Sequence, residues 1–310
     1  MTSGISIIVI CGATATGKTA AAIDVAEQVD GEIVNADSVQ VYRYLDIGAA
    51  KPTAAEQARV RHHLVDVVDP DEAFDAAAFA RLGRRAVADI AARGKVPIVA
   101  GGTGLYIKAL LGGLARRAAS DPAVRRRLQH DLAENGPAAL HARLAQIDPP
   151  TAARVHPHDA VRILRALEVF AATGQPLSAH HRAHRFGDAP FAAFSIGLDV
   201  PREMLYERIE QRVEAMVARG LEEEVRRLLA RGYGPDLKPM QSLGYRHMAA
   251  LVAGRIDRQE AVRTLKRDTR RFAKRQLTWF RANRQIRWVA PADIPSLLPE
   301  IEAFLQGDGR

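Results

Sequence analysis

Hydrophobic and polar positions alternate along the first hundred residues with two periods, one typical of buried strands and one typical of helices. Ser6–Ile10 is a continuous run rich in β-branched residues, as expected of a strand buried on both faces of a parallel sheet. The predicted strands are Ser6–Ile10, Glu32–Asn35, His63–Val68 and Val96–Ala100, and the predicted helices are Lys18–Val29 and Phe79–Ala92. Strands and helices in this order predict a parallel sheet with helices on both faces.

The pattern becomes almost wholly helical after Gly112. From Asp121 to about Gly174 the helical period is interrupted only at Gly136-Pro137 and Pro149-Pro150. A loop is predicted over Ala179–Pro190. It is followed by a strand that returns to the sheet, over Phe194–Val200, and by long helices over Arg202–Arg231. We therefore predict an α/β core formed by residues 1–115 and 186–310, with basic helices at its C-terminal end, and an inserted all-helical domain over residues 116–185.

Composition narrows the class of protein. Hydrophobic residues make up 47% and charged residues 26% of the 310, which is globular composition. No apolar run approaches the roughly 18 residues that a membrane-spanning helix needs. The apolar stretch near the N-terminus has no basic region before it and runs into a glycine motif, so we interpret it as the first core strand and not as a signal peptide. The single cysteine, Cys11, excludes an internal disulfide and a cysteine-rich zinc site, and it favours a cytoplasmic protein.

The positive charge is concentrated in one segment. The chain carries 44 Lys and Arg against 36 Asp and Glu, a formal net charge of +8. Residues 255–287 contain 12 basic and 3 acidic residues, which leaves the remainder nearly neutral. Like charges at this density repel one another unless an anionic partner is present. We interpret the segment as a nucleic-acid-binding surface rather than as a solvated helix face.

Spacing within this segment predicts a helix with basic rows beside an apolar face. The basic residues form two rows at i,i+4 spacing: Arg263, Arg267, Arg271 and Arg275, and Lys266, Arg270 and Lys274. Leu265, Phe272 and Trp279 recur every seven residues, which predicts one face against the core. We predict that Trp279 and Phe280 pack in the core, the alternative being that they stack on bases.

The sequence GATATGKT fits the phosphate-binding loop pattern. It comprises Gly12, Ala13, Thr14, Ala15, Thr16, Gly17, Lys18 and Thr19. The motif follows a predicted buried strand and opens a predicted helix, which is the context that distinguishes a phosphate loop from an ordinary glycine turn. The backbone amides and the helix N-terminus would bind an anion, Lys18 would neutralise a terminal phosphate, and the Thr19 hydroxyl would bind Mg²⁺. The fold class is thus a P-loop-containing α/β sheet, and the ligand a di- or triphosphate.

Polar residues follow two other predicted strands at the edge where open α/β sheets bind their ligands. Asp37 follows the second strand, and a carboxylate there is a general base or a metal ligand, unless it only caps a helix. Gly101–Gly104 follows a later strand, and Thr103 within it is able to donate to a phosphate oxygen, although the segment also reads as a simple turn. The Asp46–Pro52 loop has no role that its residues indicate.

Seven stretches carry a wider resemblance. They are GATATGKT, NADSVQVYRYLDIGAAKPT, HHLVDVVDPDEAF, VPIVAGGTGLYIKALL, HPHDAVRILRALEVF, QSLGYRHM and KRQLTWFR, and the resemblance as a whole extends from about Ile5 to Trp288. Together, and in this order, they resemble the bacterial tRNA dimethylallyltransferases, the family that prenylates the adenosine beside the anticodon. Departures from the family pattern are few: Ala13 in place of Pro, Ala49 in place of Thr, and His158 and Ala160-Val161 in place of Asn and Pro-Gln.

The resemblance implies a reaction and the residues that perform it. A dimethylallyl group would pass from dimethylallyl diphosphate to N6 of the adenosine on the 3′ side of the anticodon, with Mg²⁺ as cofactor. Residues 12–19 would bind the diphosphate, Thr19 the Mg²⁺, and Asp37 would take the proton of the amine. Lys18, Thr19 and an arginine would stabilise the departing diphosphate, and for that arginine Arg212 is favoured over Arg208. Thr103 would lie near the reacting adenine.

The resemblance also implies how tRNA binds. The target base must leave a stacked loop and enter a channel from the side opposite the prenyl diphosphate. The tRNA contacts carried over position by position are Asp37, Ser38, Val39, Gln40, Thr103, Arg125, Val161, Arg162, Ile163, Leu164, Arg165, Gln241, Ser242, Leu243, Gly244, Tyr245, Arg246, Lys274, Arg275, Gln276, Leu277, Thr278, Trp279, Phe280 and Arg281. The inserted domain would bind the anticodon stem-loop, and we predict a monomer with no membrane partner.

Two other functions fit part of the sequence. A P-loop kinase of a small molecule or nucleotide explains the phosphate loop and Asp37, but it leaves the basic segment without a purpose. A nucleic-acid-dependent ATPase or an RNA-binding module explains the basic segment, but the chain lacks the apolar strand ending in Asp-Glu with which an ATPase positions metal and water.

Overall fold

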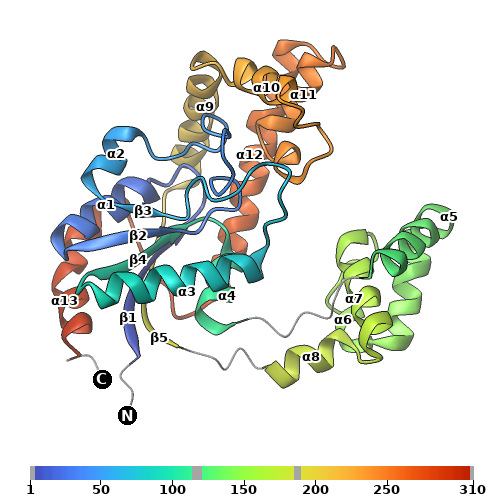
Figure 1. Ribbon diagram of the computed structural model, residues 1–310, viewed down its shortest axis with the longest axis horizontal. Helices are drawn as coiled ribbons and strands as arrows, with labels where there is room; N and C mark the ends of the chain where they lie inside the picture. The colour runs from blue at the N-terminus through green and yellow to red at the C-terminus, as the bar shows by residue number, and fades with distance from the viewer. Residues whose placement is uncertain (1–3, 114–120, 185–189, 308–310) are drawn as a thin grey trace. The chain divides into compact units, whose positions relative to one another are not determined.

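The structure, a computed structural model, describes residues 4–113, 121–184 and 190–307, and a parallel sheet lies at its centre (Figure 1). The strands are β1 (Ile5–Gly12), β2 (Gly31–Asn35), β3 (His62–His63), β4 (Val96–Gly101), β5 (Phe191–Leu198) and β6 (Arg287–Val289). Their order is β3-β2-β4-β1-β5-β6, and every neighbouring pair is parallel. The predicted fold class is confirmed.

Helices follow the strands along the chain. They are α1 (Lys18–Gln28), α2 (Ala54–Arg59), α3 (Ala76–Ala92), α4 (Gly104–Gly112), α5 (Pro122–Ile147), α6 (Pro149–Ala152), α7 (Ala160–Thr173), α8 (Leu177–His184), α9 (Arg202–Ala218), α10 (Leu221–Ala230), α11 (Tyr245–Val252), α12 (Arg258–Arg281) and α13 (Leu298–Gln306). Two 3-10 helices, η1 (Lys238–Gln241) and η2 (Pro291–Leu297), complete the list. In the described part of the chain, no helix has the length and apolar content to cross a membrane.

The first strand forms the centre of the core. β1 lies between β4 and β5, and its residues from Ile7 to Ile10 expose at most 1% of their surface. Ile8 and Ile10 belong to the same apolar cluster as residues of α1 and α13. Because successive side chains of a strand alternate between the faces of the sheet, Ile7 and Val9 point to the opposite face, which α3 covers. With both faces covered, the carboxyl edge of the sheet is where a ligand can reach the strands.

The chain divides into two compact units. Unit 1 comprises residues 1–111 and 190–310, and unit 2 comprises residues 112–189. All the elements described in unit 2 are helices, and they enclose a core of their own that includes Leu128, Leu144 and Ile163. The predicted ends of the insertion, Arg116 and Arg185, lie outside the described residues.

Two predicted elements differ from the structure. The strand predicted over His63–Val68 is reduced to His62–His63, because Leu64 and Asp66 have φ angles of 63° and 55°, which an extended strand does not allow. The loop predicted over Ala179–Pro190 contains most of α8, which begins directly after Pro176, a residue that starts helices well because its φ is already fixed. The polar composition of the segment concealed this short helix, in which even the buried position is a polar residue, Ser178.

The basic segment forms α12, but its buried face differs from the predicted one. Leu265 and Phe280 are buried as expected, whereas Trp279 is 46% exposed, so the prediction that it packs in the core is wrong. A helix turns about 100° per residue, so a strict seven-residue repeat drifts around the helix by about 20° each time. The face that stays against the protein runs instead through Ala261, Leu265, Thr269, Ala273, Gln276 and Phe280.

Candidate functional site

The phosphate-binding loop lies between the end of β1 and the start of α1, as predicted. Gly12 and Gly17 have φ angles of 148° and 94°, which residues other than glycine rarely adopt. Gly17 precedes α1 without a side-chain cap, so the amides of the first turn stay available to an anion. The Lys18 ammonium donates to the Ala13 carbonyl at 2.5 Å, and the buried Thr16 hydroxyl donates to the same oxygen at 2.9 Å. Thr16 therefore stabilises the loop from inside.

A cavity of about 600 Å³ opens over this loop within unit 1. Its lining includes most of the loop together with Lys18 and Thr19 at the start of α1, and it brings together segments that are far apart in the sequence. These are Asp37–Gln40 after β2, Gly48–Pro52 before α2, Gly101–Thr103 after β4, Arg212 on α9, part of Gln241–Arg246, and Phe272, Arg275 and Gln276 on α12. Arg208 is not among the described residues that line the cavity.

Three charged groups face one another in the cavity. Burial and, after it, the positive charge of Arg212 lower the pKa of Lys18 to about 8, although the carboxylate of Asp37 opposes both effects. Burial likewise lowers the pKa of Arg212, and Asp37 again acts in the opposite direction. Two desolvated cations that are offset by a single carboxylate leave an excess of positive charge. The cavity is therefore suited to an anion such as a diphosphate.

The turn that carries Asp37 is fixed by hydrogen bonds on both sides. One oxygen of Asp37, Oδ1, accepts from the amides of Val39 and Gln40 at 2.8 and 3.2 Å. The Thr103 hydroxyl accepts from the Ser38 amide at 3.1 Å and lies 3.3 Å from the Ser38 hydroxyl. Gly101 allows this approach, because a Cβ there would lie only 2.2 Å from the Ala36 carbonyl oxygen. The structure thus brings Asp37 and Thr103 together.

Gln276 of α12 ties two of the cavity's turns together. Its Oε1 accepts from the Thr14 amide of the phosphate loop at 2.9 Å, and its Nε2 donates to the Gly102 carbonyl at 2.8 Å. The side chain of Gln40 is similarly occupied, since its Nε2 donates to the carbonyls of Ala49 and Ala50, each at 3.0 Å. Both glutamines were predicted to contact tRNA, but both amides are engaged within the protein.

Three other predicted tRNA contacts have no exposed side chain. Ile163, Tyr245 and Phe280 are all less than 5% exposed, so the structure does not support contacts through their side chains. The family motifs from which these contacts were predicted contain both surface residues and residues that pack between helices. A motif match alone does not distinguish the two kinds of residue. The predicted contacts with exposed side chains are Arg125, Val161, Arg162, Arg165, Gln241, Arg246, Lys274, Arg275, Thr278, Trp279 and Arg281.

Four of these exposed residues belong to unit 2. Val161 is 79% exposed, which is unusual for a valine, and it lies at the start of α7. Arg125 of α5 and Arg165 of α7 both reach the buried carboxylate of Glu168, at 3.5 and 3.6 Å. One carboxylate therefore holds arginines from two helices near each other on the surface of unit 2.

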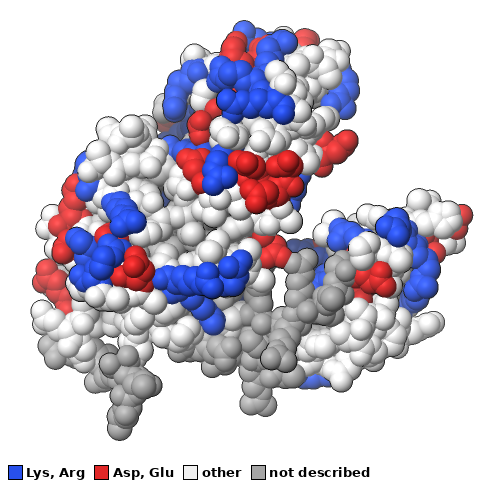
Figure 2. All heavy atoms as spheres, in the orientation of Figure 1, with Lys and Arg blue, Asp and Glu red and all other residues white. Residues whose placement is uncertain are grey.

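Each basic row of α12, a helix that the structure describes throughout, leaves one cation without an ion pair. In the first row, Arg263 pairs with Glu260, and Arg267 and Arg271 pair with Asp268. In the second row, Lys266 and Arg270 form ion pairs with Glu214 and Glu210 of α9 and so help to join two helices. In the part of the chain that the structure describes, Lys274 and Arg275 are in no ion pair, and both are exposed. Figure 2 shows further Lys and Arg side chains gathered over the α9–α10 end of unit 1 and in a row over α3. The net charge counted along the sequence did not reveal these basic groups, because acidic residues close to them in the sequence cancel their charge.

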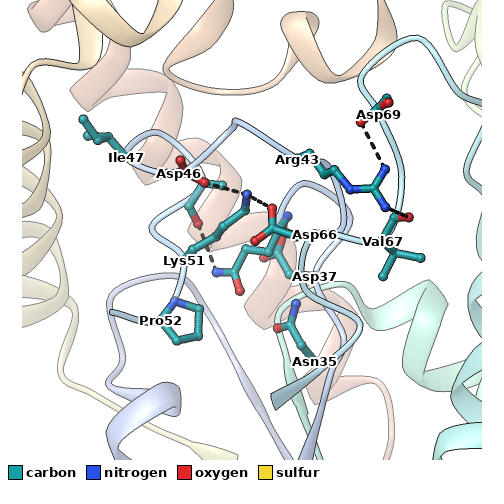
Figure 3. Close-up of polar contacts among 12 residues, drawn as sticks. Asn35, Asp37, Arg43, Asp46, Ile47, Lys51, Pro52, Asp66, Val67 and Asp69 are labelled. Atoms are coloured by element: carbon teal, nitrogen blue, oxygen red, sulfur yellow. Dashed lines mark hydrogen bonds and ion pairs between the residues drawn. The ribbon is translucent and has the colours of Figure 1, made fainter. Parts of the chain in front are cut away.

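The Asp46–Pro52 loop, to which sequence gave no role, forms a wall of the cavity. Lys51 lies between Asp46 and Asp66, at 2.7 and 2.5 Å (Figure 3), although its own side chain is only 6% exposed. The carboxylate of Glu224, from α10, accepts the amides of Asp46, Ile47 and Gly48. No local pattern identifies Glu224, because it is one of three consecutive glutamates.

The oxygen donors near the phosphate loop suit a magnesium ion that is coordinated mainly by water and by the phosphates of a bound substrate. The Thr19 hydroxyl and the Asp37 carboxylate both face the cavity. No group of three or more His, Cys, Asp or Glu residues within the described ranges is arranged to hold a metal. Mg²⁺ commonly takes one or two protein oxygens and completes its coordination with water and substrate phosphates. The residues therefore fit this ion.

The sheet, the phosphate loop and the cationic cavity define a P-loop-containing α/β protein whose cavity is suited to a phosphorylated ligand. The family model described as IPP transferase matches residues 40–283. The chain belongs to this family.

Relatives that resemble almost the whole chain agree with the family match. A tRNA dimethylallyltransferase of Desulfosudis oleivorans is 56% identical over 91% of this chain and 90% of its own length. That of Geobacter metallireducens is 51% identical over 96% of this chain and 97% of its own. These names confirm the predicted resemblance and do not support the kinase alternative.

Solved structures of similar proteins have the same fold. The full-length tRNA isopentenylpyrophosphate transferase of Bacillus halodurans is 37% identical, with a TM-score of 0.73, over 97% of both chains. A eukaryotic dimethylallyltransferase, described as acting on tRNA, is 26% identical with a TM-score of 0.79, over 98% of this chain and 79% of its own.

Proposed function

We propose that this chain transfers the dimethylallyl group of dimethylallyl diphosphate to N6 of the adenosine that follows the anticodon in tRNA. The family supports the reaction. The observation that carries the assignment of the site is the arrangement of Lys18, Arg212 and Asp37 in one cavity. A cationic end suits a diphosphate, and a carboxylate beside it suits proton removal from a weakly nucleophilic amine.

In the proposed reaction, two bonds form and two break: carbon–nitrogen and oxygen–hydrogen bonds form, and carbon–oxygen and nitrogen–hydrogen bonds break. The N6 nitrogen of adenine attacks the allylic carbon, the bond from that carbon to the diphosphate oxygen breaks, and the amine proton passes to Asp37. Val39 and Gln40 donate their amides to one oxygen of Asp37, which leaves the second oxygen to accept the proton. Adenine N6 is a poor nucleophile because its lone pair is delocalised into the ring, so a correctly oriented base matters.

Negative charge accumulates on the diphosphate as it departs. Lys18, Arg212 and the uncapped start of α1 all lie at the cavity, and the Ala13 carbonyl already holds the Lys18 ammonium, an arrangement suited to stabilising such charge. Thr19 would hold Mg²⁺, which supplies additional positive charge to the leaving group when bound. Thr103 orients the turn of Asp37 through Ser38, next to the place where the adenine would lie.

The affinity for the prenyl diphosphate is expected to fall as the pH rises above about 8. The pKa of Lys18 is lowered to about 8, so the ammonium that attracts the diphosphate is present below that pH and lost above it. An anion favours the charged form, so the pKa is higher in the complex, and the affinity falls up to about tenfold per pH unit between the two pKa values. Calorimetry with dimethylallyl S-thiolodiphosphate, an unreactive analogue, from pH 7 to 9.5 measures this. A constant affinity over that range would contradict the role given to Lys18.

Replacing both Lys274 and Arg275 by Ala is expected to weaken tRNA binding and reduce its dependence on salt. Each lost phosphate contact lowers the slope of log K against log salt by about 0.7 to 0.9, so the double variant should lose about 1 to 2 units of slope. Filter binding of an anticodon stem-loop from 50 to 300 mM KCl gives the slope. Lys95→Ala is the control, because Lys95 precedes β4 at the opposite edge of the sheet from the cavity. An unchanged slope in the double variant would remove α12 from the tRNA surface.

Mass spectrometry of nucleosides tests the proposed function as a whole. Unmodified tRNA is incubated with the protein, Mg²⁺ and dimethylallyl diphosphate, and a parallel sample contains ATP in place of the prenyl donor. Addition of one five-carbon prenyl group to the adenosine beside the anticodon in the first sample supports the proposal. No prenylation there, with phosphate release or transfer in the second, would favour a kinase or ATPase instead.

A further inference from the structure

A buried carboxylate and a buried phenol organise one wall of the cavity without lining it themselves. Glu224 of α10 is 4% exposed and Tyr245 of α11 is fully buried. The Tyr245 hydroxyl donates to Glu224 Oε1 at 2.7 Å, and burial together with the charge of Glu224 raises the pKa of Tyr245 well above its usual value. The phenol is therefore a permanent hydrogen-bond donor to the carboxylate.

This pair holds four consecutive amides of the loop before α2. Glu224 Oε2 accepts from Asp46 and Ile47 at 3.2 and 2.8 Å, and Oε1 accepts from Gly48 at 3.2 Å. The next amide, that of Ala49, donates to the Tyr245 hydroxyl at 3.1 Å. Gly48 also lies directly on the aromatic ring, since a Cβ there would be 2.6 Å from Tyr245 Cε2. Both partners therefore hold this loop.

The loop is connected in turn to the proposed base. Its carbonyls at Ala49 and Ala50 both accept from the side chain of Gln40, at 3.0 Å. The backbone amide of Gln40 donates to Asp37 Oδ1 at 3.2 Å. An unbroken series of contacts therefore runs from α10 and α11, through the loop and Gln40, to the carboxylate of Asp37.

We propose that Glu224 and Tyr245 are positioning residues for the transfer reaction: they fix the Asp46–Ala50 loop, and through Gln40 this loop fixes the orientation of Asp37. The inference rests on the proposed role of Asp37 as the base. A displacement of about 1 Å in a reacting group can lower the rate about a hundredfold. Loss of the contacts made by Glu224 or Tyr245 should therefore lower the rate constant of the chemical step. Neither residue touches substrate, so the affinity for RNA should change little.

The test compares Glu224→Gln and Tyr245→Phe with wild type in single-turnover prenyl transfer to an anticodon stem-loop, with enzyme and dimethylallyl diphosphate saturating. The Gln variant places an NH₂ group among amide donors, and the Phe variant removes one donor while keeping the ring and the carboxylate. We expect the rate constant to fall about 10- to 100-fold for Glu224→Gln and about 3- to 10-fold for Tyr245→Phe, with the Kd for RNA within about threefold of wild type. Glu223→Gln is the matched control, because it changes an exposed glutamate on the same helix.

A second background separates positioning from a general loss of structure. In Asp37→Asn protein the base is already absent, so adding Glu224→Gln should lower the residual rate by less than about threefold, whereas a merely structural defect would lower it as much as before. Equal losses in the two backgrounds, or rates within twofold of wild type for both single variants, would overturn the inference. Failure of the proposed function appears differently, as no prenylated RNA from the wild-type protein, and it would overturn both.

Discussion

Asp37→Asn is expected to lower the rate of prenyl transfer by about 10²- to 10⁴-fold, the range that a general base contributes. The amide has nearly the shape of the carboxylate but does not take the proton of the adenine amine. The affinity for the prenyl diphosphate, in contrast to the rate, should not fall. Asp37 opposes the cations Lys18 and Arg212, so its neutralisation leaves the cavity more positive and should hold or increase the affinity for the diphosphate.

Two measurements on the same variant test both halves of this expectation. Single-turnover prenyl transfer gives the rate, and calorimetry with the thiolodiphosphate analogue gives the affinity. Asp71→Asn is the control, because Asp71 is an exposed aspartate outside the cavity lining. Turnover near the wild-type level would exclude Asp37 as the base, and a large loss of affinity would make it chiefly a binding residue.

Lys18→Met is expected to lower turnover by about 10²- to 10³-fold, the effect of removing one preorganised group that stabilises developing negative charge. Methionine keeps the length of the side chain but not the ammonium. Affinity for the diphosphate analogue should fall as well, since Lys18 faces the ligand both before and during the reaction. RNA affinity measured without the prenyl donor should be unchanged, because the ammonium donates to the Ala13 carbonyl of the phosphate loop, where the diphosphate and not the RNA would bind.

The pH dependence provides a specific check on this variant. If the loss of affinity above about pH 8 comes from Lys18, the Met variant should bind the analogue with a nearly constant affinity from pH 7 to 9.5. Lys95→Met should keep the wild-type profile. A Met variant that still follows the wild-type pH dependence would assign the titration to another group.

The sequence predicted the parts of the site that are contiguous in the chain. The phosphate loop is recognisable because its glycines, Lys18 and Thr19 act within one turn and their spacing is set by local geometry. Asp37 was found from its place after a strand, since the carboxyl ends of parallel strands meet at one edge of the sheet. Gln276 and Glu224 were not predicted to support the site, because their roles depend on contacts that join residues more than 170 positions apart.

Errors in the predicted elements have equally local causes. The seven-residue repeat of Leu265, Phe272 and Trp279 suggested a straight apolar face, but a single helix drifts away from such a repeat, and Trp279 ends at the surface. The short strand β3 ends at His63, just before Leu64, whose positive φ no apolar pattern reveals. Polarity suggested a loop where α8 forms, because even the buried position of this helix is occupied by a polar residue, Ser178.

The position of β1 between β4 and β5 also determines the order in which the strands of the sheet can pair during translation. β1 and β4 can pair as soon as residue 101 has been made, but the other partner of β1 begins only at Phe191, after the whole of unit 2. Translation at about 5 to 20 residues per second places roughly 5 to 20 s between these events. During that interval one edge of the most apolar strand is unpaired, and such edges promote aggregation. Nascent chains of this protein are therefore expected to depend on a chaperone until β5 is added, while unit 2, with its own core, is free to fold first.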